Sequence, residues 1–128
     1  MSSAMKNYLR KHPEVRTIRV AAADLNGQPR GKRVPSRFAD KVVEDGTRFP
    51  ISVLNLDIWG EDIDDSPLVF ESGDADGVLK PTERGFVPMP WLEAPTALLP
   101  IWMFREDGRP YDGDPRQALR AVVDRYKE

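Results

Sequence analysis

The sequence predicts an α+β fold, in which a small mixed sheet packs with helices and further helices flank it at the N- and C-terminal ends. The first observation is residues 17–24, where side chains alternate with the period of a strand before an Asn-Gly pair. The second is a series of short strand-like pieces separated by Gly, Asp and Pro. The chain has 128 residues, 40% of them hydrophobic, which suits a single core. One domain over residues 1–128 is therefore expected.

A helix and a hairpin are expected first. Residues 4–11 space their apolar side chains as a helix does, and Pro13 ends the pattern. In the strand that follows, the predicted buried face consists of Ile18, Val20 and Ala22. Because Asn26-Gly27 tolerates positive φ, it suits a tight turn that returns the chain as a second strand over residues 29–35.

A second helix is expected over residues 37–45, capped by Ser36 and ended by Gly46. Four short β-like pieces follow, at residues 48–58, 67–72, 77–82 and 84–90. Residues 96–104 then form a strongly apolar strand. Because Pro100 lacks an N–H group, we expect it at an edge or a bulge.

The C-terminal helix, over about residues 115–127, has the clearest signals. Asp114 is the expected N-cap and Pro115 the first helical residue, while Gln117 completes a capping box. The predicted buried face of this helix consists of Leu119, Val122, Val123 and Tyr126.

An acidic segment is the most unusual feature of the composition. Its eight carboxylates, with no Lys or Arg among them, are Asp57, Glu61, Asp62, Asp64, Asp65, Glu71, Asp74 and Asp76. A solvated loop is the favoured interpretation, because uncompensated burial of so many charges is too costly. A calcium loop is the alternative, but the run at residues 74–77 puts its glycine at the wrong position and lacks the closing glutamate of an EF-hand. No metal site is predicted.

The sequence also contains a set of basic residues. It consists of Arg19, Arg30, Lys32, Arg33 and Arg37. Such a set could bind phosphate or nucleic acid, or it could be the solvated face of the hairpin, paired in part with the acidic loop. No aromatic residues alternate with these cations, and the net charge is −2, so nucleic acid is not an expected partner.

Residue content excludes several classes of site. Without cysteine the chain has no disulfide, thiolate nucleophile or cysteine-ligated zinc. His12 is the only histidine and has no Ser or Cys partner that would make a triad, so it is expected on the surface and no catalytic residue is assigned. No stretch approaches the roughly 20 apolar residues that span a bilayer. A cytoplasmic protein without membrane contact is expected.

Six motifs occur in a characteristic order. They are DLNGQPRGKRVP, RFADKVVEDGTRFPISV, LDIWG, SGDADGVLKPT, VPMPW and REDGRPYDGDPRQALR. In this order and spacing, from about Arg16 to the end, the chain resembles the N-terminal β-grasp domain of the glutamine synthetase superfamily. The resemblance implies a β-grasp-like arrangement of the sheet and helices, which agrees with the hairpin, helix and strands expected above.

The resemblance also implies a function in nitrogen metabolism, such as glutamine biosynthesis. Enzymes of this family use ATP to activate the γ-carboxylate of glutamate and join it to ammonia or an amine. Their catalytic barrel follows the helix that here ends at Glu128, and it holds ATP and Mg or Mn. The N-terminal domain completes the active site of a neighbouring subunit in a homo-oligomeric ring. The chain alone, with no cofactor of its own, is therefore expected to be inactive and to partner its missing catalytic domain and neighbouring subunits.

Three substrate-binding residues follow from the resemblance. The glutamine synthetase pattern F-D-G-S-S matches here at Phe49 and Ser52, but its ammonium-binding Asp is replaced by Pro50. A second carboxylate, Asp57, would then serve, or the substrate is another amine. The pattern looks most like that of γ-glutamylpolyamine and γ-glutamylamine synthetases, for which an acidic mouth over residues 57–65 would attract a polycationic amine.

A free-standing β-grasp protein-interaction module is the alternative, because the fold alone serves adaptors as readily as enzymes. Exposed apolar surface separates the two hypotheses. A ligase domain is expected to present a large apolar patch to its barrel, including Trp91, Trp102 or Phe104, whereas an adaptor is expected to be polar there.

Overall fold

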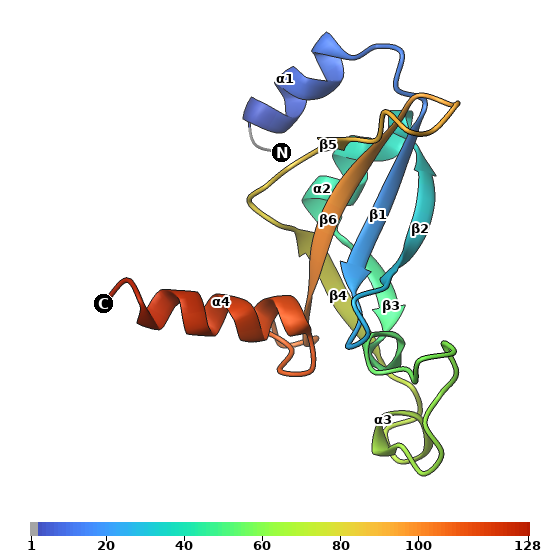
Figure 1. Ribbon diagram of the computed structural model, residues 1–128, viewed down its shortest axis with the longest axis vertical. Helices are drawn as coiled ribbons and strands as arrows, with labels where there is room; N and C mark the ends of the chain where they lie inside the picture. Colours follow the sequence, from blue (N-terminus) through green and yellow to red (C-terminus); the bar gives the residue numbers. More distant parts are fainter. Residues whose placement is uncertain (1–2) are drawn as a thin grey trace. The chain divides into compact units, whose positions relative to one another are not determined.

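The protein is described by a computed structural model that covers residues 3–128 (Figure 1). The helices are α1 Ser3–Lys11, α2 Ala39–Asp45, α3 Pro67–Phe70 and α4 Pro115–Arg125. Two 3₁₀ turns are η1 Ser36–Phe38 and η2 Ile51–Leu54. The strands are β1 Thr17–Ala23, β2 Pro29–Pro35, β3 Thr47–Pro50, β4 Asp76–Pro81, β5 Val87–Pro88 and β6 Thr96–Phe104. The predicted α+β class, with a mixed sheet and helices, is confirmed.

The strands run in the order β2-β1-β6-β4-β3, and β5 pairs with β6 outside this path. β1 and β6 are parallel neighbours, in register from Thr17 opposite Thr96 to Ala21 opposite Pro100 (Figure 1). β5 is antiparallel to β6. The sheet is therefore mixed, as the sequence predicts.

The chain forms two compact units, each described by itself below. The first unit contains the described part of Met1–Ala21 together with Gly31–Thr47 and Lys80–Ile101. The second unit contains Ala22–Arg30, Arg48–Leu79 and Trp102–Glu128.

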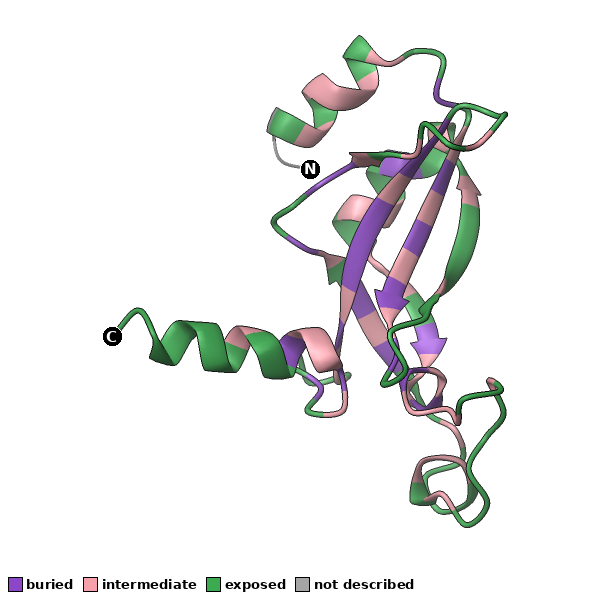
Figure 2. Ribbon diagram, viewed as in Figure 1, coloured by how far each residue is buried: buried purple, intermediate pink, exposed green. Residues whose placement is uncertain are grey.

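The core of the first unit lies on β1 and β6 (Figure 2). Ile18 and Val20 are buried, as predicted, and so are Ala97, Leu99 and Ile101 on the neighbouring strand. β2 comes so close to β1 that a Cβ at Gly31 would lie 1.7 Å from the Val20 carbonyl oxygen. Only glycine fits at that position.

Pro100 does not lie at an edge, because β6 is an interior strand of the sheet and Pro100 is buried in it. The residue is the last registered partner of β1, opposite Ala21. Its carbonyl oxygen still accepts a hydrogen bond from the Thr82 N–H at 2.9 Å. Proline therefore fits here because its carbonyl oxygen is used as an acceptor, while its missing N–H falls at the end of the hydrogen-bonded pairing of β1 with β6.

Two segments expected to be strands differ in the structure. Residues 67–72 begin with the helical turn α3, because Ser66 is extended and Pro67 stands at the first helical position, where its missing N–H has no helical partner to lose. The segment 48–58 is a strand only to Pro50 and continues as η2.

The start of α2 also differs from prediction, whereas the hairpin turn and the end of α2 are confirmed. Ser36 begins a 3₁₀ turn after Pro35, so α2 starts later, at Ala39, and Ser36 does not cap it. Gly27 and Gly46 both adopt positive φ, of 76° and 77°. These are the positions where the sequence predicts a turn and a helix end.

In the second unit, the start of α4 is confirmed and its buried face is not. Asp114 accepts a hydrogen bond from the Arg116 N–H at 2.8 Å, and Pro115 follows it. Gln117 does not close a capping box, because its Nε2 donates to the Met103 carbonyl oxygen at 3.0 Å. The predicted buried face is exposed at Leu119, Val122, Val123 and Tyr126. Helical spacing identifies the apolar face, but within the described chain little covers it.

Because Leu119 is 62% exposed and Leu99 is fully buried, the two leucines should respond differently to truncation. In the 128-residue protein, Leu119→Ala is expected to change the free energy of unfolding by less than about 0.5 kcal/mol. Leu99→Ala removes packed core atoms and should cost about 2–5 kcal/mol. Urea unfolding followed by circular dichroism measures both. A loss above about 2 kcal/mol for Leu119→Ala would show that α4 packs inward.

Candidate functional site

The three substrate-binding residues predicted from the sequence lie on one segment of the second unit, and the structure does not converge them on a common point. Phe49, in β3, and Ser52, in η2, are buried. Asp57 lies beyond η2 and is partly exposed. Of the three side chains, that of Asp57 is therefore the one that a ligand from solvent could reach.

Ser52 holds the start of the segment to the chain just before β4. Its Oγ donates a hydrogen bond to Oδ1 of Asp74, at 2.5 Å. Next to this bond, the Ile51 N–H donates to the Ala75 carbonyl oxygen at 3.0 Å. Asp74 itself has a φ of 53°, in the left-handed region that non-glycine residues seldom adopt.

Asn55 holds the other end of η2 to the loop that precedes α4. Its Nδ2 donates to the Gly113 carbonyl oxygen at 3.0 Å, and its Oδ1 accepts a hydrogen bond from the buried Tyr111 hydroxyl. A Cβ at Gly113 would lie 2.4 Å from that hydroxyl, so glycine leaves the space for this contact. Sequence reasoning missed Asn55 and Tyr111, because their partners lie more than fifty positions away.

Asp57 forms a tight turn that presents the tip of the segment. Its Oδ1 accepts hydrogen bonds from the N–H groups of Trp59 and Glu61, both at 2.9 Å. Asn26 of the hairpin turn donates from Nδ2 to the carbonyl oxygens of Leu56 and Asp57, both at 3.0 Å. Since both side-chain bonds of Asp57 use Oδ1, its Oδ2 is a further acceptor.

A buried carboxylate, Asp24, organises the hairpin turn beneath Asn26. Its Oδ1 accepts hydrogen bonds from the N–H groups of Asn26 and Gln28, both at 2.8 Å, and its Oδ2 pairs with Arg30 Nε at 2.9 Å. Burial by itself raises the pKa of Asp24, but the hydrogen bonds from Gln28, Arg30 and Asn26 and the Arg30 charge together lower it. Arg30, expected as part of a basic face, thus pairs with Asp24. The sequence signal for this role of Asp24 was its position two residues before the Asn26-Gly27 turn.

A second buried carboxylate, Asp114, joins β6 to α4. Besides the cap bond to Arg116, its Oδ2 accepts the Met103 N–H at 2.6 Å. Burial raises the pKa of Asp114, and the hydrogen bonds that it accepts do not fully offset the burial.

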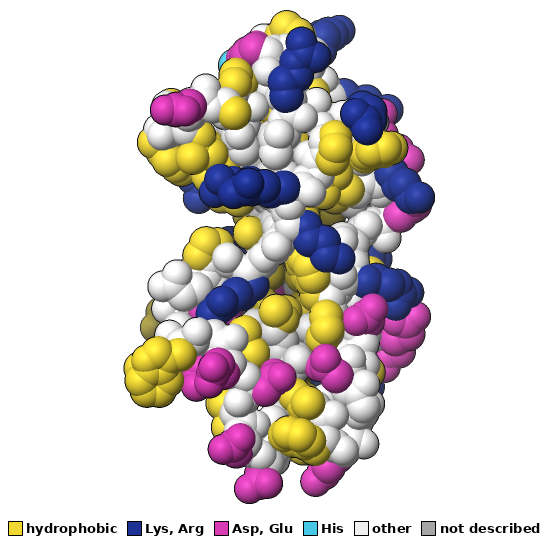
Figure 3. Space-filling view, turned by 90° about the vertical axis from the view of Figure 1, so that its right-hand side faces the viewer, with side chains coloured by type: hydrophobic (Ala, Val, Ile, Leu, Met, Phe, Trp, Pro, Cys, Tyr) yellow, Lys and Arg dark blue, Asp and Glu magenta, His cyan; other side chains and the backbone are white. Residues whose placement is uncertain are grey.

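The loop that follows Asp57 combines carboxylates with exposed apolar side chains. Exposed carboxylates are Glu61, Asp62, Asp64, Asp65 and Glu71. Exposed large apolar residues on the same loop are Ile58, Trp59, Ile63 and Phe70, of which Trp59 is 80% exposed. Figure 3 shows one face of the molecule, with Asp, Glu and hydrophobic side chains gathered at its lower end, the end that holds α3 in Figure 1. This mixed acidic and apolar surface is called the acidic loop below and comprises residues 57–72.

No three His, Asp or Glu side chains converge as metal ligands among residues 3–128. None of the helices over the same residues is long and apolar enough to cross a membrane.

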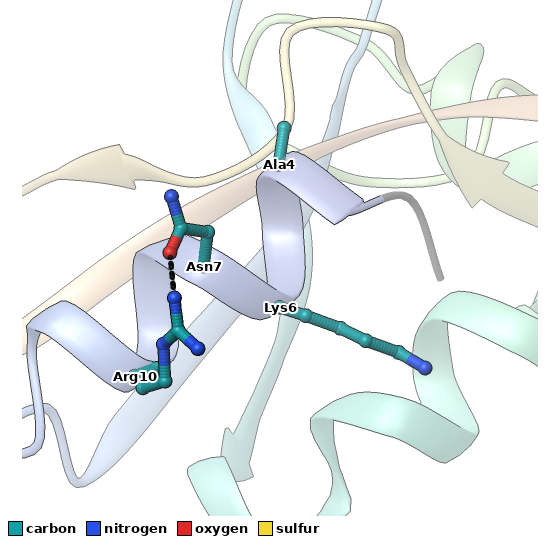
Figure 4. Close-up of a pocket in the computed structure, with 4 residues that line it drawn as sticks. All are labelled: Ala4, Lys6, Asn7 and Arg10. Carbon is teal, nitrogen blue, oxygen red and sulfur yellow. Dashed lines mark hydrogen bonds between the residues drawn. The ribbon is translucent and has the colours of Figure 1, made fainter.

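A separate open hollow of about 480 Å³ lies on α1 in the first unit (Figure 4). It is lined by Ala4, Lys6, Asn7 and Arg10, and Arg10 donates to the Asn7 side-chain oxygen at 2.7 Å. Its cations lie on an exposed helix face and gather no acid, base or nucleophile around them. We assign no chemistry to this hollow.

Asp24 should make the protein sensitive to acid. Because its folded-state pKa is lowered, its contribution to stability is present above the unfolded pKa of about 3.9 and is lost as the pH falls through the folded pKa. At pH 7, Asp24→Ala is expected to lose about 2–3 kcal/mol, since Arg30 and two backbone N–H groups lose their acceptor. Urea unfolding at pH 7 and pH 3 measures the loss. The exposed Asp40→Ala variant is the control, and an Asp24→Ala loss of equal size at both pH values would contradict the assignment.

Comparisons with known proteins place the chain in a family. No family model matches it. The γ-glutamylputrescine synthetase PuuA of Escherichia coli is 32% identical over 97% of this chain and 26% of its own length. The glutamine synthetase of Pyrococcus horikoshii is 28% identical over 89% of this chain and 22% of its own length.

A solved structure, a complex of GmaS with ADP, matches with a TM-score of 0.71 and 26% identity over 94% of this chain and 25% of that one. The chain thus spans about a quarter of the length of the relatives that it matches. In these relatives the matched part is the N-terminal part. The chain belongs to the glutamine synthetase superfamily and corresponds to the N-terminal domain of its ligases.

Proposed function

We propose that this sequence serves an ATP-dependent glutamate–amine ligase, in which it completes the active site of a neighbouring subunit within a homo-oligomer. The observation that carries the proposal is the similarity to a γ-glutamylputrescine synthetase over 97% of this chain. In this proposal Asp57 and the acidic loop form the contribution to the neighbouring site, with Phe49 and Ser52 as the buried support beneath them.

Position 50 supports an amine larger than ammonia. Pro50 stands where the resemblance implies an ammonium-binding carboxylate, and proline carries no charge to hold a cation. The nearest carboxylate along the chain beyond it, Asp57, has Oδ2 as a further acceptor, and exposed carboxylates follow it. Several carboxylates at one surface attract a diamine or polyamine more strongly than a monovalent cation.

The exposed apolar residues support a role within a larger assembly. Apolar side chains lie exposed on α4, on the acidic loop and at Trp91, while Trp102 and Phe104 are half-buried. A module that works alone is expected to be polar at such places. The free-standing interaction module is therefore the less favoured function.

ATP with Mg²⁺ or Mn²⁺ would supply the phosphoryl group that activates the glutamate γ-carboxylate. Because residues 3–128 offer no converging ligand set, we assign no step of the reaction to a metal held by this chain. The role of its own residues is to hold the acidic loop in place and to present carboxylates to the amine. A cytoplasmic location fits the small metabolites that such a ligase consumes.

The 128-residue protein should release no phosphate from ATP in the presence of glutamate and putrescine, because positioned cations around the γ-phosphate are needed for phosphoryl transfer. A coupled phosphate assay over several purification steps measures this. Activity that stays with the protein through those steps would contradict the proposal.

In the proposed ligase, which would contain this sequence as its N-terminal domain and is called the longer ligase below, Asp57→Asn should raise the KM for putrescine about fivefold. One exposed charge pair at contact distance contributes about 1 kcal/mol. The KM for glutamate should stay unchanged. Added salt should shrink the difference between variant and wild type, because it screens exposed charges.

Asp40→Asn, which removes an exposed charge on α2, is the matched control for this experiment. An unchanged KM for putrescine in Asp57→Asn would remove Asp57 from the amine site.

A further inference from the structure

We propose that Asp74 is a positioning residue: through Ser52 it closes the base of the acidic loop and so sets where Asp57 meets the amine. The inference rests on the proposed function for its catalytic consequence. Its structural basis lies entirely within the second unit.

The closure consists of two adjacent hydrogen bonds. Ser52 and Asp74 are 22 positions apart, and their side chains meet at 2.5 Å. The backbone bond from Ile51 to Ala75 lies directly beside them, at 3.0 Å. The whole acidic loop therefore lies between two points of the chain that are bonded together. A long loop with joined ends loses much of the freedom that its length would otherwise give.

The Ser52 hydroxyl is directed to this bond and away from solvent. Ser52 is buried, with 6% of its surface exposed. A buried hydroxyl without a partner is costly, and a carboxylate is a stronger acceptor than a neutral group. Ser52 thus supports the site through Asp74.

The backbone conformation of Asp74 also supports a role for its side chain. Its φ of 53° follows the Gly73 φ of 67°, so two successive residues are left-handed. For a non-glycine residue this conformation is strained, and it persists where surrounding contacts hold it. The turn brings the carboxylate back to Ser52, whereas glycine at this position would supply the turn alone.

Asn55 fixes the same segment from its other end. Through Gly113 and Tyr111 it joins η2 to the loop before α4, and Asn26 then holds the carbonyl of Asp57. Loss of the Asp74 contact should therefore loosen the base of the acidic loop without unfolding η2. The expected consequence is misplacement of Asp57 by a local motion.

The first arm of the test is independent of catalysis. Hydrogen exchange of the 128-residue protein follows the Ile51 amide, whose bond lies beside the Ser52–Asp74 pair. In Asp74→Ala and in Ser52→Ala this amide should exchange at least about tenfold faster, while amides of β6 keep their wild-type rates. In Asp74→Asn, which keeps an acceptor oxygen, most of the protection should return. Wild-type protection of Ile51 in both alanine variants would overturn the proposal.

The second arm measures the longer ligase. Asp74→Ala should raise the KM for the amine about tenfold, with kcat and the KM values for ATP and glutamate within about twofold of wild type. Asp74→Asn should recover most of the affinity. Adding Ser52→Ala to Asp74→Ala should produce little further change, since both remove the same bond. Asp40→Ala, which removes an exposed carboxylate on α2 outside the acidic loop, is the matched control.

The outcomes separate the two proposals. A wild-type ligase that is inactive with every amine would overturn the proposed function and, with it, the catalytic role of Asp74. An active ligase in which Asp74→Ala leaves the amine KM within twofold of wild type would overturn the role of Asp74 alone. Equal effects of Asp74→Ala and Asp40→Ala would also overturn it, because they would indicate loss of charge and not loss of position.

Discussion

The parallel pairing of β1 with β6 is the interaction on which the rest of the sheet depends. β6 is the strand that β1, β4 and β5 all join, and its register with β1 places buried side chains of the two strands together, such as Val20 opposite Leu99. Parallel neighbours cannot be joined by a tight turn, so the chain between them must travel away and return. That connection contains α2, β3, the acidic loop and β4. The candidate site is thus a product of the long connection that parallel pairing requires.

Two buried carboxylates hold the irregular chain near the ends of these strands, and they respond to pH in opposite directions. Asp24 follows β1, and its pKa is lowered because the hydrogen bonds from Gln28, Arg30 and Asn26, together with the Arg30 charge, outweigh burial. Its contribution to stability therefore disappears in acid. Asp114 accepts hydrogen bonds from β6 and α4, and burial raises its pKa. Its contribution is therefore present in acid and is lost as the pH rises through the folded pKa. The two groups differ in whether the hydrogen bonds and the nearby cation outweigh the effect of burial, as they do at Asp24 and do not at Asp114.

Local signals in the sequence predicted the elements well, because alternation, turn glycines and capping residues act over a few positions. Ile18 and Val20, the turn at Gly27 and the cap at Asp114 all follow such rules. The errors arise where distant chain decides the outcome. Pro100 lies in an interior strand, where its carbonyl oxygen accepts from the Thr82 N–H, and Gln117 bonds to Met103 in place of its own helix end. The apolar face of α4 was identified correctly as apolar, but burial depends on what covers it.

The candidate site shows the same division between local and distant information. The motif resemblance predicted Phe49, Ser52 and Asp57 as site residues, and the acidic composition of the loop is evident from the sequence itself. Asn55 and Tyr111 gave no local signal, because the hydrogen bond between them joins residues 56 positions apart in the sequence. Asp74 was counted among eight carboxylates and was singled out only by its bond to Ser52.

The acidic loop has a fixed base and an exposed tip, and this combination suits a surface that is completed by contact. Covering Trp59 and Ile58 would gain about 25 cal/mol for each Å² of apolar surface removed from water. The same contact would desolvate the neighbouring carboxylates, at a cost that a partner of opposite charge offsets. A cationic amine bound among those carboxylates therefore makes the contact more favourable, and the contact in turn strengthens binding of the amine. In the proposed ligase, docking of the acidic loop and binding of the amine are thus reciprocally coupled.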